Sequence, residues 1–139
     1  MSKVILITGA SSGIGKAIGD LLCNKNFKVY GTSRDPSKYI DSNIQILSFD
    51  ISQKDKIEEF VENATKELGG NLDCIVNNAG ITQDNLAIRM SLEEWQKIID
   101  INLTSTFLMS KFAIKKMLKN KSGKIVNITS VVGLSLIHI

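Results

Sequence analysis

A glycine-rich turn near the start of the chain separates an apolar run from an amphipathic stretch. The turn reads Thr8-Gly9-Ala10-Ser11-Ser12-Gly13-Ile14-Gly15. Residues 3–8 are almost uninterruptedly apolar, which is typical of a strand buried on both faces, and residues 13–25 carry apolar side chains at helical spacing. A strand that enters a helix through such a turn presents bare backbone N–H groups and the positive end of the helix dipole, where a dinucleotide pyrophosphate binds. The alternative, a glycine turn without a ligand, is disfavoured by this strand–turn–helix context.

The turn predicts a set of backbone and hydroxyl groups that contact the pyrophosphate. Glycine is needed where a Cβ would block the approach of the backbone, and serine adds hydroxyl donors. The predicted contacts are Gly9, Ser11, Ser12, Gly13, Ile14 and Gly15. The turn lacks a Gly-Lys-Ser/Thr ending, which excludes a nucleoside-triphosphate P-loop.

The remaining sequence alternates short apolar runs with longer amphipathic stretches. Further strands are predicted at 27–32, 44–49, 73–77 and 124–129. Helices are predicted from a capping signal at Ser52 and Asp55 to about Leu68, from a second signal at Ser91 and Glu94, and over 103–118. This alternation predicts an α/β fold, a Rossmann-type doubly wound parallel sheet with helices on both faces.

Composition narrows the class of protein and its partners. The chain has 139 residues, about the size of one domain, with 43% hydrophobic and 22% charged residues. A net charge of +3 falls short of a nucleic-acid-binding signature, and no apolar run reaches the roughly 18 residues of a membrane span. Cys23 and Cys74 lie among apolar neighbours, which favours free thiols and a cytoplasmic location. We therefore expect no nucleic-acid or membrane partner, and we predict no metal site.

The spacing Thr-Gly-x-x-x-Gly-x-Gly resembles the fingerprint of the short-chain dehydrogenase/reductase family. Four further features match that family in order: Asp50, Asn77-Asn78-Ala79-Gly80, Asn102 and Ser130. Each alone has an ordinary explanation, such as a turn asparagine, an N-cap aspartate or a strand-end serine. The match of all four, at the expected strand ends, favours the family.

The resemblance implies a role for each matching residue. Asp50, with Ile51 beside it, would contact the adenine, and Asn77, Ala79 and Gly80 would border the nicotinamide-side ribose. In the catalytic site, Asn102 would help to hold a proton-relay water, and Ser130 would donate a hydrogen bond to the substrate carbonyl.

A narrower resemblance follows the Asn-Asn-Ala-Gly motif. Residues 80–86, with Arg89-Met90, Trp95 and the run 130–133, look like the 3-oxoacyl-[acyl-carrier-protein] reductases of fatty-acid synthesis. That implies NADPH-dependent reduction of a 3-oxoacyl thioester carried on acyl carrier protein, by a homotetramer. The alternatives are a non-catalytic NAD(P)-binding regulatory domain, or a family member that acts on another alcohol or ketone. Asn102 and Ser130 favour an enzyme, because a binding domain needs no groups that orient a carbonyl.

The residues after the second predicted strand bear on the choice of cofactor. In this fold an acidic residue there selects NAD, whereas a nearby arginine accommodates the 2′-phosphate of NADP. Here Ser33 takes the acidic position and Arg34 lies beside it, which favours NADP(H) over NAD(H). Asp35 is the counter-evidence, since a shift of one or two residues would let it select NAD.

The family's proton donor, a Tyr-x-x-x-Lys pair about a dozen residues after the serine, does not occur in the sequence. The two tyrosines, Tyr30 and Tyr39, belong to another region. We therefore expect residues 1–133 to be the NAD(P)-binding part of a longer domain that is inactive alone. Residues 134–139 depart from the polar, glycine-containing loop of the family, and we interpret them as a non-native tail.

Six lysines cluster around the end of the last predicted helix and the strand after it. They are Lys111, Lys115, Lys116, Lys119, Lys121 and Lys124. A solvated helix face whose cations complement the helix dipole is the favoured interpretation. A docking patch for an acidic acyl carrier protein is the other, and the two are compatible.

Overall fold

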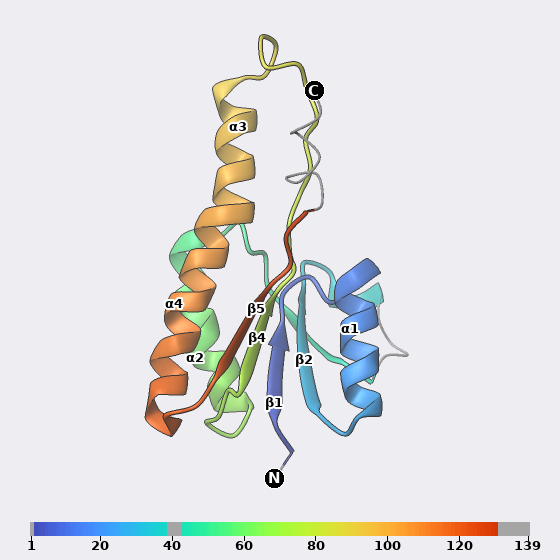
Figure 1. Ribbon diagram of the computed structural model, residues 1–139, viewed down its shortest axis with the longest axis vertical. Helices are drawn as coiled ribbons and strands as arrows, with labels where there is room; N and C mark the ends of the chain where they lie inside the picture. Colours follow the sequence, from blue (N-terminus) through green and yellow to red (C-terminus); the bar gives the residue numbers. More distant parts are fainter. Residues whose placement is uncertain (1, 39–42, 131–139) are drawn as a thin grey trace.

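A five-stranded parallel sheet forms the centre of the protein, in the order β3-β2-β1-β4-β5 (Figure 1). The computed structural model describes residues 2–38 and 43–130. The strands are β1 Val4–Ile7, β2 Lys28–Ser33, β3 Gln45–Ser48, β4 Cys74–Asn77 and β5 Lys124–Asn127. The helices are α1 Gly13–Asn24, α2 Ile57–Glu67, α3 Leu92–Ile99 and α4 Ser105–Met117. Short helical turns complete the list: η1 Pro36–Lys38, η2 Lys54–Lys56, η3 Asp100–Thr104 and η4 Leu118–Asn120.

The strand order reverses at β1, which pairs with β2 on one side and with β4 on the other. Ligands of open α/β sheets bind outside the carboxyl ends of the strands at such a switch point. The order of the strands therefore marks the carboxyl ends of β1 and β4 as the place to look for a site.

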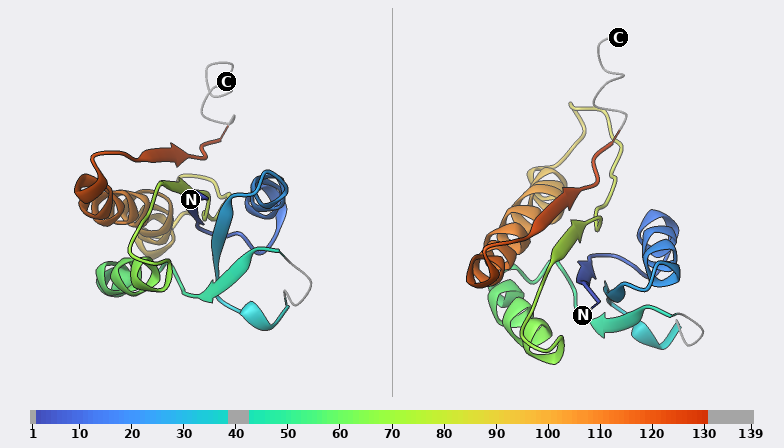
Figure 2. Two further views of the ribbon diagram at one scale, coloured as in Figure 1. Left: turned by 90° about the horizontal axis from the view of Figure 1, so that it is seen from below. Right: turned by 60° about the horizontal axis from the view of Figure 1, so that its bottom comes forward.

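The two faces of the sheet are covered unequally. Along β1, Val4 and Leu6 pack on one face with α2 and α4, whereas Ile5 and Ile7 pack on the other face with α1. Figure 2 shows α2 and α4 together on one side and α1 alone on the other. The helix-rich face therefore holds the larger core, into which Met109 of α4 is fully buried.

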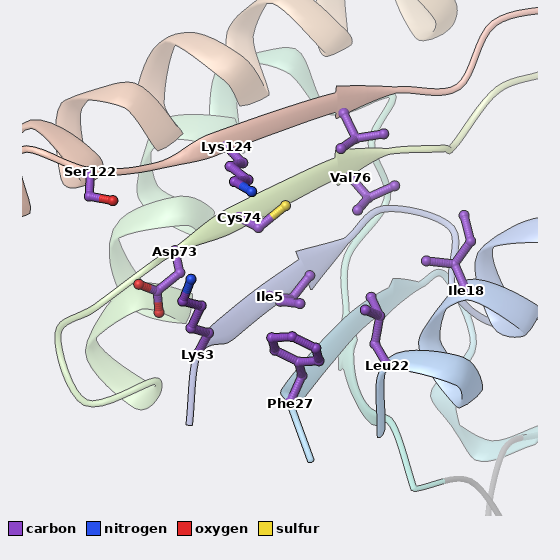
Figure 3. A pocket seen from close by; sticks show the side chains of 11 residues that line it. Lys3, Ile5, Ile18, Leu22, Phe27, Asp73, Cys74, Val76, Ser122 and Lys124 are labelled. Atoms are coloured by element: carbon purple, nitrogen blue, oxygen red, sulfur yellow. The ribbon is translucent and has the colours of Figure 1, made fainter. Parts of the chain in front are cut away.

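The α1 face is hollow beside the helix, over β1, β4 and β5 (Figure 3). The hollow measures about 360 Å³ and is walled by apolar side chains such as Ile5, Phe27 and Val76, with Lys3 and Lys124 also on its lining. It contains none of the residues predicted to bind the cofactor or to act in catalysis. The hollow is therefore separate from the site described below.

The predicted fold is confirmed, and so is the capping box at Ser91 and Glu94, whose reciprocal hydrogen bonds open α3. The capping signal at Ser52 is wrong. The backbone N–H of Ser52 donates to Asp50, a 3₁₀ turn begins at Lys54, and α2 starts only at Ile57. The predicted boundary between residues 133 and 134 lies outside the described residues.

The last predicted helix does not begin at residue 103. Instead α3 runs through the π-helical turn η3 into α4 without a break, as Figure 1 shows. Among the described residues, no helix has both the length and the apolar character needed to cross a membrane.

Candidate functional site

The glycine turn between β1 and α1 is built by close approach of backbone to backbone. A Cβ on Gly15 would lie 2.3 Å from the carbonyl oxygen of Gly9, and one on Gly9 would lie 3.1 Å from the Cα of Ala79. Gly9 and Gly13 have φ of 67° and 54°, in the left-handed region. A Cβ on Gly13 would meet nothing within 4 Å, so open space lies above the start of α1.

The first turn of α1 has no side-chain cap. Ser12 is the N-cap residue, with an extended backbone, and its hydroxyl makes no capping hydrogen bond. The N–H groups at a helix N-terminus need an acceptor, and the helix dipole favours an anion there. The bare glycine surface and the uncapped helix together leave room and unpaired N–H groups for an anion, and the pyrophosphate site stays a prediction from the sequence.

Thr8 holds the turn against the end of β4. Its Oγ1, on a residue that is 1% exposed, accepts hydrogen bonds from the N–H groups of Asn78 and Ala79, both at 3.0 Å. The amide of Asn78 donates in return to the carbonyl oxygens of Thr8 and Gly9, at 3.1 and 3.0 Å. Sequence reasoning assigned no role to Thr8, although the threonine before the first glycine was the available signal.

A small cavity of about 150 Å³ brings together five of the predicted cofactor-binding residues. They are Arg34, Asp50, Ile51, Ala79 and Gly80. The backbone N–H of Ser52 donates to Asp50 at 2.9 Å and is the main cause that lowers the pKa of this carboxyl, with Arg34 adding a smaller Coulombic effect. Asp50 is therefore an ionised acceptor at neutral pH, facing a cavity that Arg34 also lines.

Ser33 and Asp35 point into their own turn. The hydroxyl of Ser33 accepts from the N–H of Asp35 at 3.2 Å, and the carboxylate of Asp35 accepts from the hydroxyl and N–H of Ser37, at 2.5 and 3.2 Å. Neither residue lines the small cavity, whereas Arg34 does. This arrangement leaves Arg34 as the charged group of the turn that lines the cavity.

A larger cavity of about 630 Å³ brings together the two predicted catalytic residues, Asn102 and Ser130. Ile14, Asn77, Ala79 and Gly80 also line it, and Ala79 and Gly80 are shared with the small cavity. Predicted groups from the glycine turn, the end of β4, η3 and the segment after β5 therefore converge on one space.

The side chain of Asn102 is engaged with the backbone of one residue. Its Oδ1 accepts from the N–H of Ile81 at 2.9 Å, and its Nδ2 donates to the carbonyl of Ile81 at 2.8 Å. The backbone carbonyl of Asn102 accepts from the hydroxyl of Thr106 at 2.9 Å. Asn102 thus fixes the wall of the cavity after Gly80, a contact that spans 21 residues of sequence.

In the wall of the larger cavity, the amide of Asn77 links β4, β5 and α4. Its Nδ2 donates to Ser110 at 2.9 Å and to Asn127 at 2.8 Å, and Asn127 is also its register partner in β5. Its Oδ1 is buried and has no partner among the described residues. Sequence reasoning missed both Ser110 and Asn127.

The polar groups of the larger cavity are hydroxyls, carboxamides and backbone groups. None of its described lining residues is charged, and none is a tyrosine or a lysine. Hydroxyl and amide groups can orient a carbonyl by hydrogen bonding, but at neutral pH they do not deliver a proton to an alkoxide. The described residues that line this cavity therefore supply binding and orientation, and none of them is an acid suited to protonate an alkoxide.

The short chain dehydrogenase family profile matches residues 3–138. The 3-oxoacyl-[acyl-carrier-protein] reductases of Vibrio cholerae and Escherichia coli K12 are 44% and 42% identical to the chain over 137 residues. In each case the match covers 94% of this chain and 56% of the relative. The chain therefore spans a little over half the length of these relatives.

Solved structures show the same arrangement. Ligand-free aldohexose dehydrogenase from Thermoplasma acidophilum superposes with a TM-score of 0.85 at 37% identity, covering 94% of this chain and 50% of the other. ElxO with NADP bound superposes with a TM-score of 0.85 at 33% identity, covering 96% of this chain and 58% of the other.

Proposed function

The chain belongs to the short-chain dehydrogenase family, and on that premise we propose that the complete protein reduces a carbonyl to an alcohol with NADPH. The proposed substrate is a 3-oxoacyl thioester on acyl carrier protein, as the names of the two bacterial relatives reported above indicate. One observation carries the proposal: Asn102 and Ser130 line a single cavity that shares a wall with the pocket of Arg34 and Asp50.

In this proposal, most of the site residues bind the cofactor, and Ser130 orients the substrate. The nicotinamide cofactor, when bound, supplies the hydride. The N–H groups of residues 13–15 and the hydroxyls of Ser11 and Ser12 would hold its pyrophosphate at the start of α1. Asp50 and Ile51 would border the adenine, and Asn77, Ala79 and Gly80 the nicotinamide-side ribose. Ser130 would donate a hydrogen bond to the carbonyl oxygen of the substrate.

Proton delivery needs a group beyond those that line the cavity. The family uses a tyrosine whose pKa is lowered by a lysine, and the 139-residue sequence contains no Tyr-x-x-x-Lys. Both the oxygen and the nitrogen of the Asn102 amide are hydrogen-bonded to Ile81. We therefore propose that Asn102 positions the cavity wall after Gly80, next to the proton-relay water that the family resemblance implies. We therefore propose that residues 1–133, without the pair, bind the cofactor and do not turn over substrate.

The preference for NADP is part of the proposal and depends on Arg34. Arg34 lines the small cavity, while the carboxylate of Asp35 is held by Ser37. A guanidinium pairs with a phosphate through charge-assisted hydrogen bonds, whereas an engaged carboxylate is a poor partner for a ribose hydroxyl.

The Arg34→Ala variant tests this preference. We expect its Kd for NADPH to rise about 10- to 100-fold, the value of one charge-assisted contact of about 1.5–3 kcal/mol, and its Kd for NADH to change less than about twofold. Fluorescence titration of both dinucleotides measures this, with Lys56→Ala as the control because it removes an exposed cation that lines neither cavity. An equal loss for both dinucleotides would contradict the assignment, and failure of the wild type to bind either would contradict the proposed function.

A family member acting on a different alcohol is the second candidate, favoured by the 37% identity to an aldohexose dehydrogenase. The complete protein decides between them through kcat/KM for a 3-oxoacyl thioester and for an aldohexose. The proposal requires the thioester to be the better substrate by orders of magnitude. Activity with neither, together with tight dinucleotide binding, would favour the non-catalytic regulatory domain.

The lysine cluster supports the solvated-face interpretation more than a docking patch. Lys115 pairs with Glu58 at 2.9 Å and Lys116 with Glu62 at 3.0 Å, so two of the six cations join α4 to α2. The cytoplasmic location and the homotetramer remain part of the proposal, and light scattering of the complete protein tests the second.

A further inference from the structure

The π-helical turn η3 is pinned by a fully buried hydroxyl, that of Ser105. Its Oγ lies 2.8 Å from the carbonyl oxygen of Asp100, at the start of the turn, and 2.9 Å from the carbonyl oxygen of Ile51, in the loop after β3. The N–H of Ser105 also donates to the carbonyl of Asp100, which closes the π turn. One side chain thus joins the turn to a loop 54 residues away in sequence.

The same turn is attached on its other side to the wall after β4. Asn102 makes its two hydrogen bonds with Ile81 there. Ile101, within the turn, lines the small cavity together with Ile51 and Ile81. The turn therefore bridges two walls of that cavity, one through Ser105 and the other through Asn102.

The link between the π turn and Ile51 depends on one hydroxyl group, that of Ser105. A π turn is an irregular helical element that other interactions must hold in place, and such turns occur frequently at functional sites. Alanine at position 105 would fit the space and has a higher helix propensity than serine. Ser105→Ala would remove the hydroxyl contacts with the carbonyls of Ile51 and Asp100. The N–H of Ser105 would keep its own bond to Asp100, so the variant tests the link to Ile51 with little change in packing.

We propose that Ser105 is a positioning residue for the binding site: its hydroxyl holds the π turn against Ile51, and through the turn it keeps Asn102 paired with Ile81 when the small cavity is filled. The inference rests on the proposed function in one respect, which is that the small cavity takes the adenosine end of a dinucleotide. It adds a residue that contacts neither cavity to those that determine how tightly the cofactor is held.

Amide hydrogen exchange of Ile81, measured by NMR on the 139-residue chain, tests the proposal directly. The probe is adenosine 2′,5′-bisphosphate, which carries the adenine and both phosphates of the adenosine end. In the wild type we expect the probe to slow exchange of the Ile81 amide by about fivefold or more, the lower end of typical coupling between sites. In Ser105→Ala we expect less than about twofold slowing and a Kd for the probe about fivefold higher.

Thr65→Val is the matched control. Thr65 is also buried, and its hydroxyl also donates to a helix carbonyl, that of Val61 at 2.6 Å, but it lines neither cavity. The core amide of Ile75 reports global stability in all three proteins. Slowing at Ile81 that survives in Thr65→Val and is lost in Ser105→Ala supports the proposal. Equal slowing in Ser105→Ala and the wild type overturns it.

Failure of the proposed function gives a different result. If the probe does not bind the wild type, the cofactor assignment fails, and the ligand-free exchange rates decide the positioning role. Exchange at Ile81 that is at least about threefold faster in Ser105→Ala than in Thr65→Val supports that role, and equal rates overturn it. If Ser105→Ala does not fold, Ser105→Cys, whose thiol is a much weaker donor than a hydroxyl, takes its place, and less slowing at Ile81 than in Thr65→Val supports the proposal while equal slowing overturns it.

Discussion

The glycine turn of residues 8–15 and the π turn of residues 100–104 both depart from regular structure, and both abut the same segment after β4. They differ in the part that steric contact plays. A Cβ on Gly9 would meet Ala79, so the glycine turn is fitted by steric contact of backbone with backbone in addition to the hydrogen bonds of Thr8 and Asn78. The π turn is fitted by side-chain hydrogen bonds, from Asn102 to Ile81 and from Ser105 to Ile51. The backbone contacts at Gly9 and Gly15 leave no room for a Cβ, whereas substitutions can remove the hydrogen bonds of the π turn one at a time.

The largest effect is expected from Gly15→Ala in the glycine turn. The new Cβ would lie 2.3 Å from the carbonyl oxygen of Gly9, and a backbone atom cannot move aside as a flexible side chain can. We expect a loss of about 3 kcal/mol in the free energy of unfolding, from overpacking. Dinucleotide affinity should fall about 100-fold, which corresponds to about 2.7 kcal/mol, because the turn must open to relieve the clash. Urea denaturation and fluorescence titration measure the two effects.

Gly13→Ala is the comparison within the same turn. Gly13 has positive φ but open space around its Cβ position, so alanine there costs only backbone strain, about 1 kcal/mol. If Gly15→Ala were no worse than Gly13→Ala, the glycine turn would be tolerant, and its contrast with the π turn would disappear.

A smaller effect is expected where the glycine turn meets β4, at Thr8. Thr8→Val keeps the shape of the side chain and leaves two partly buried N–H groups, those of Asn78 and Ala79, without their acceptor. We expect a loss of about 2–3 kcal/mol in the free energy of unfolding. Thr32→Val is the matched control, since Thr32 is also buried and accepts a single N–H bond, from Gly9 at 3.1 Å. In urea denaturation, we expect Thr32→Val to lose about half as much free energy of unfolding as Thr8→Val. Equal losses would show that the number of N–H groups left without an acceptor does not determine the effect.

The same contrast explains what the sequence could predict. The strands, their parallel arrangement and the glycine turn follow from local patterns, since an apolar run, a glycine spacing and a helical period each occupy a short stretch of sequence. The residues that gather at the site were predicted through resemblance, and the structure places Asn102 and Ser130 on one cavity. Ser105, Ser110 and Asn127 were missed because their partners lie 33 to 54 residues away, and no local pattern indicates them.

The error at Ser52 has a related cause. A serine three residues before an acidic residue has the spacing of a capping box, but Asp50 competes for the N–H of Ser52. The loop therefore turns on Asp50, and α2 begins five residues later than the signal. A predicted cofactor-binding residue thus also shapes the backbone of its own cavity.

The smallest predicted effect on stability concerns the loop of residues 50–52. Ser105 joins the π turn to this loop through the carbonyl of Ile51. The hydrogen bond from the N–H of Ser52 lowers the pKa of Asp50 below its ordinary value of 3.8. A carboxyl whose pKa is lower in the folded state contributes stability above the unfolded value, and this contribution is lost as the pH falls through 3.8 and below. Because Asp50 is only partly buried and solvent screens its charge, the contribution is a few tenths of a kcal/mol. Asp50→Asn should therefore lose slightly less free energy of unfolding than the wild type between pH 5 and pH 3, as measured with urea, and the exposed Asp55→Asn serves as control. An identical pH dependence in Asp50→Asn and the wild type would mean that the charge of Asp50 adds no stability to the loop, which would leave the hydrogen bond from Ser105 to Ile51 as a tie that does not depend on that charge.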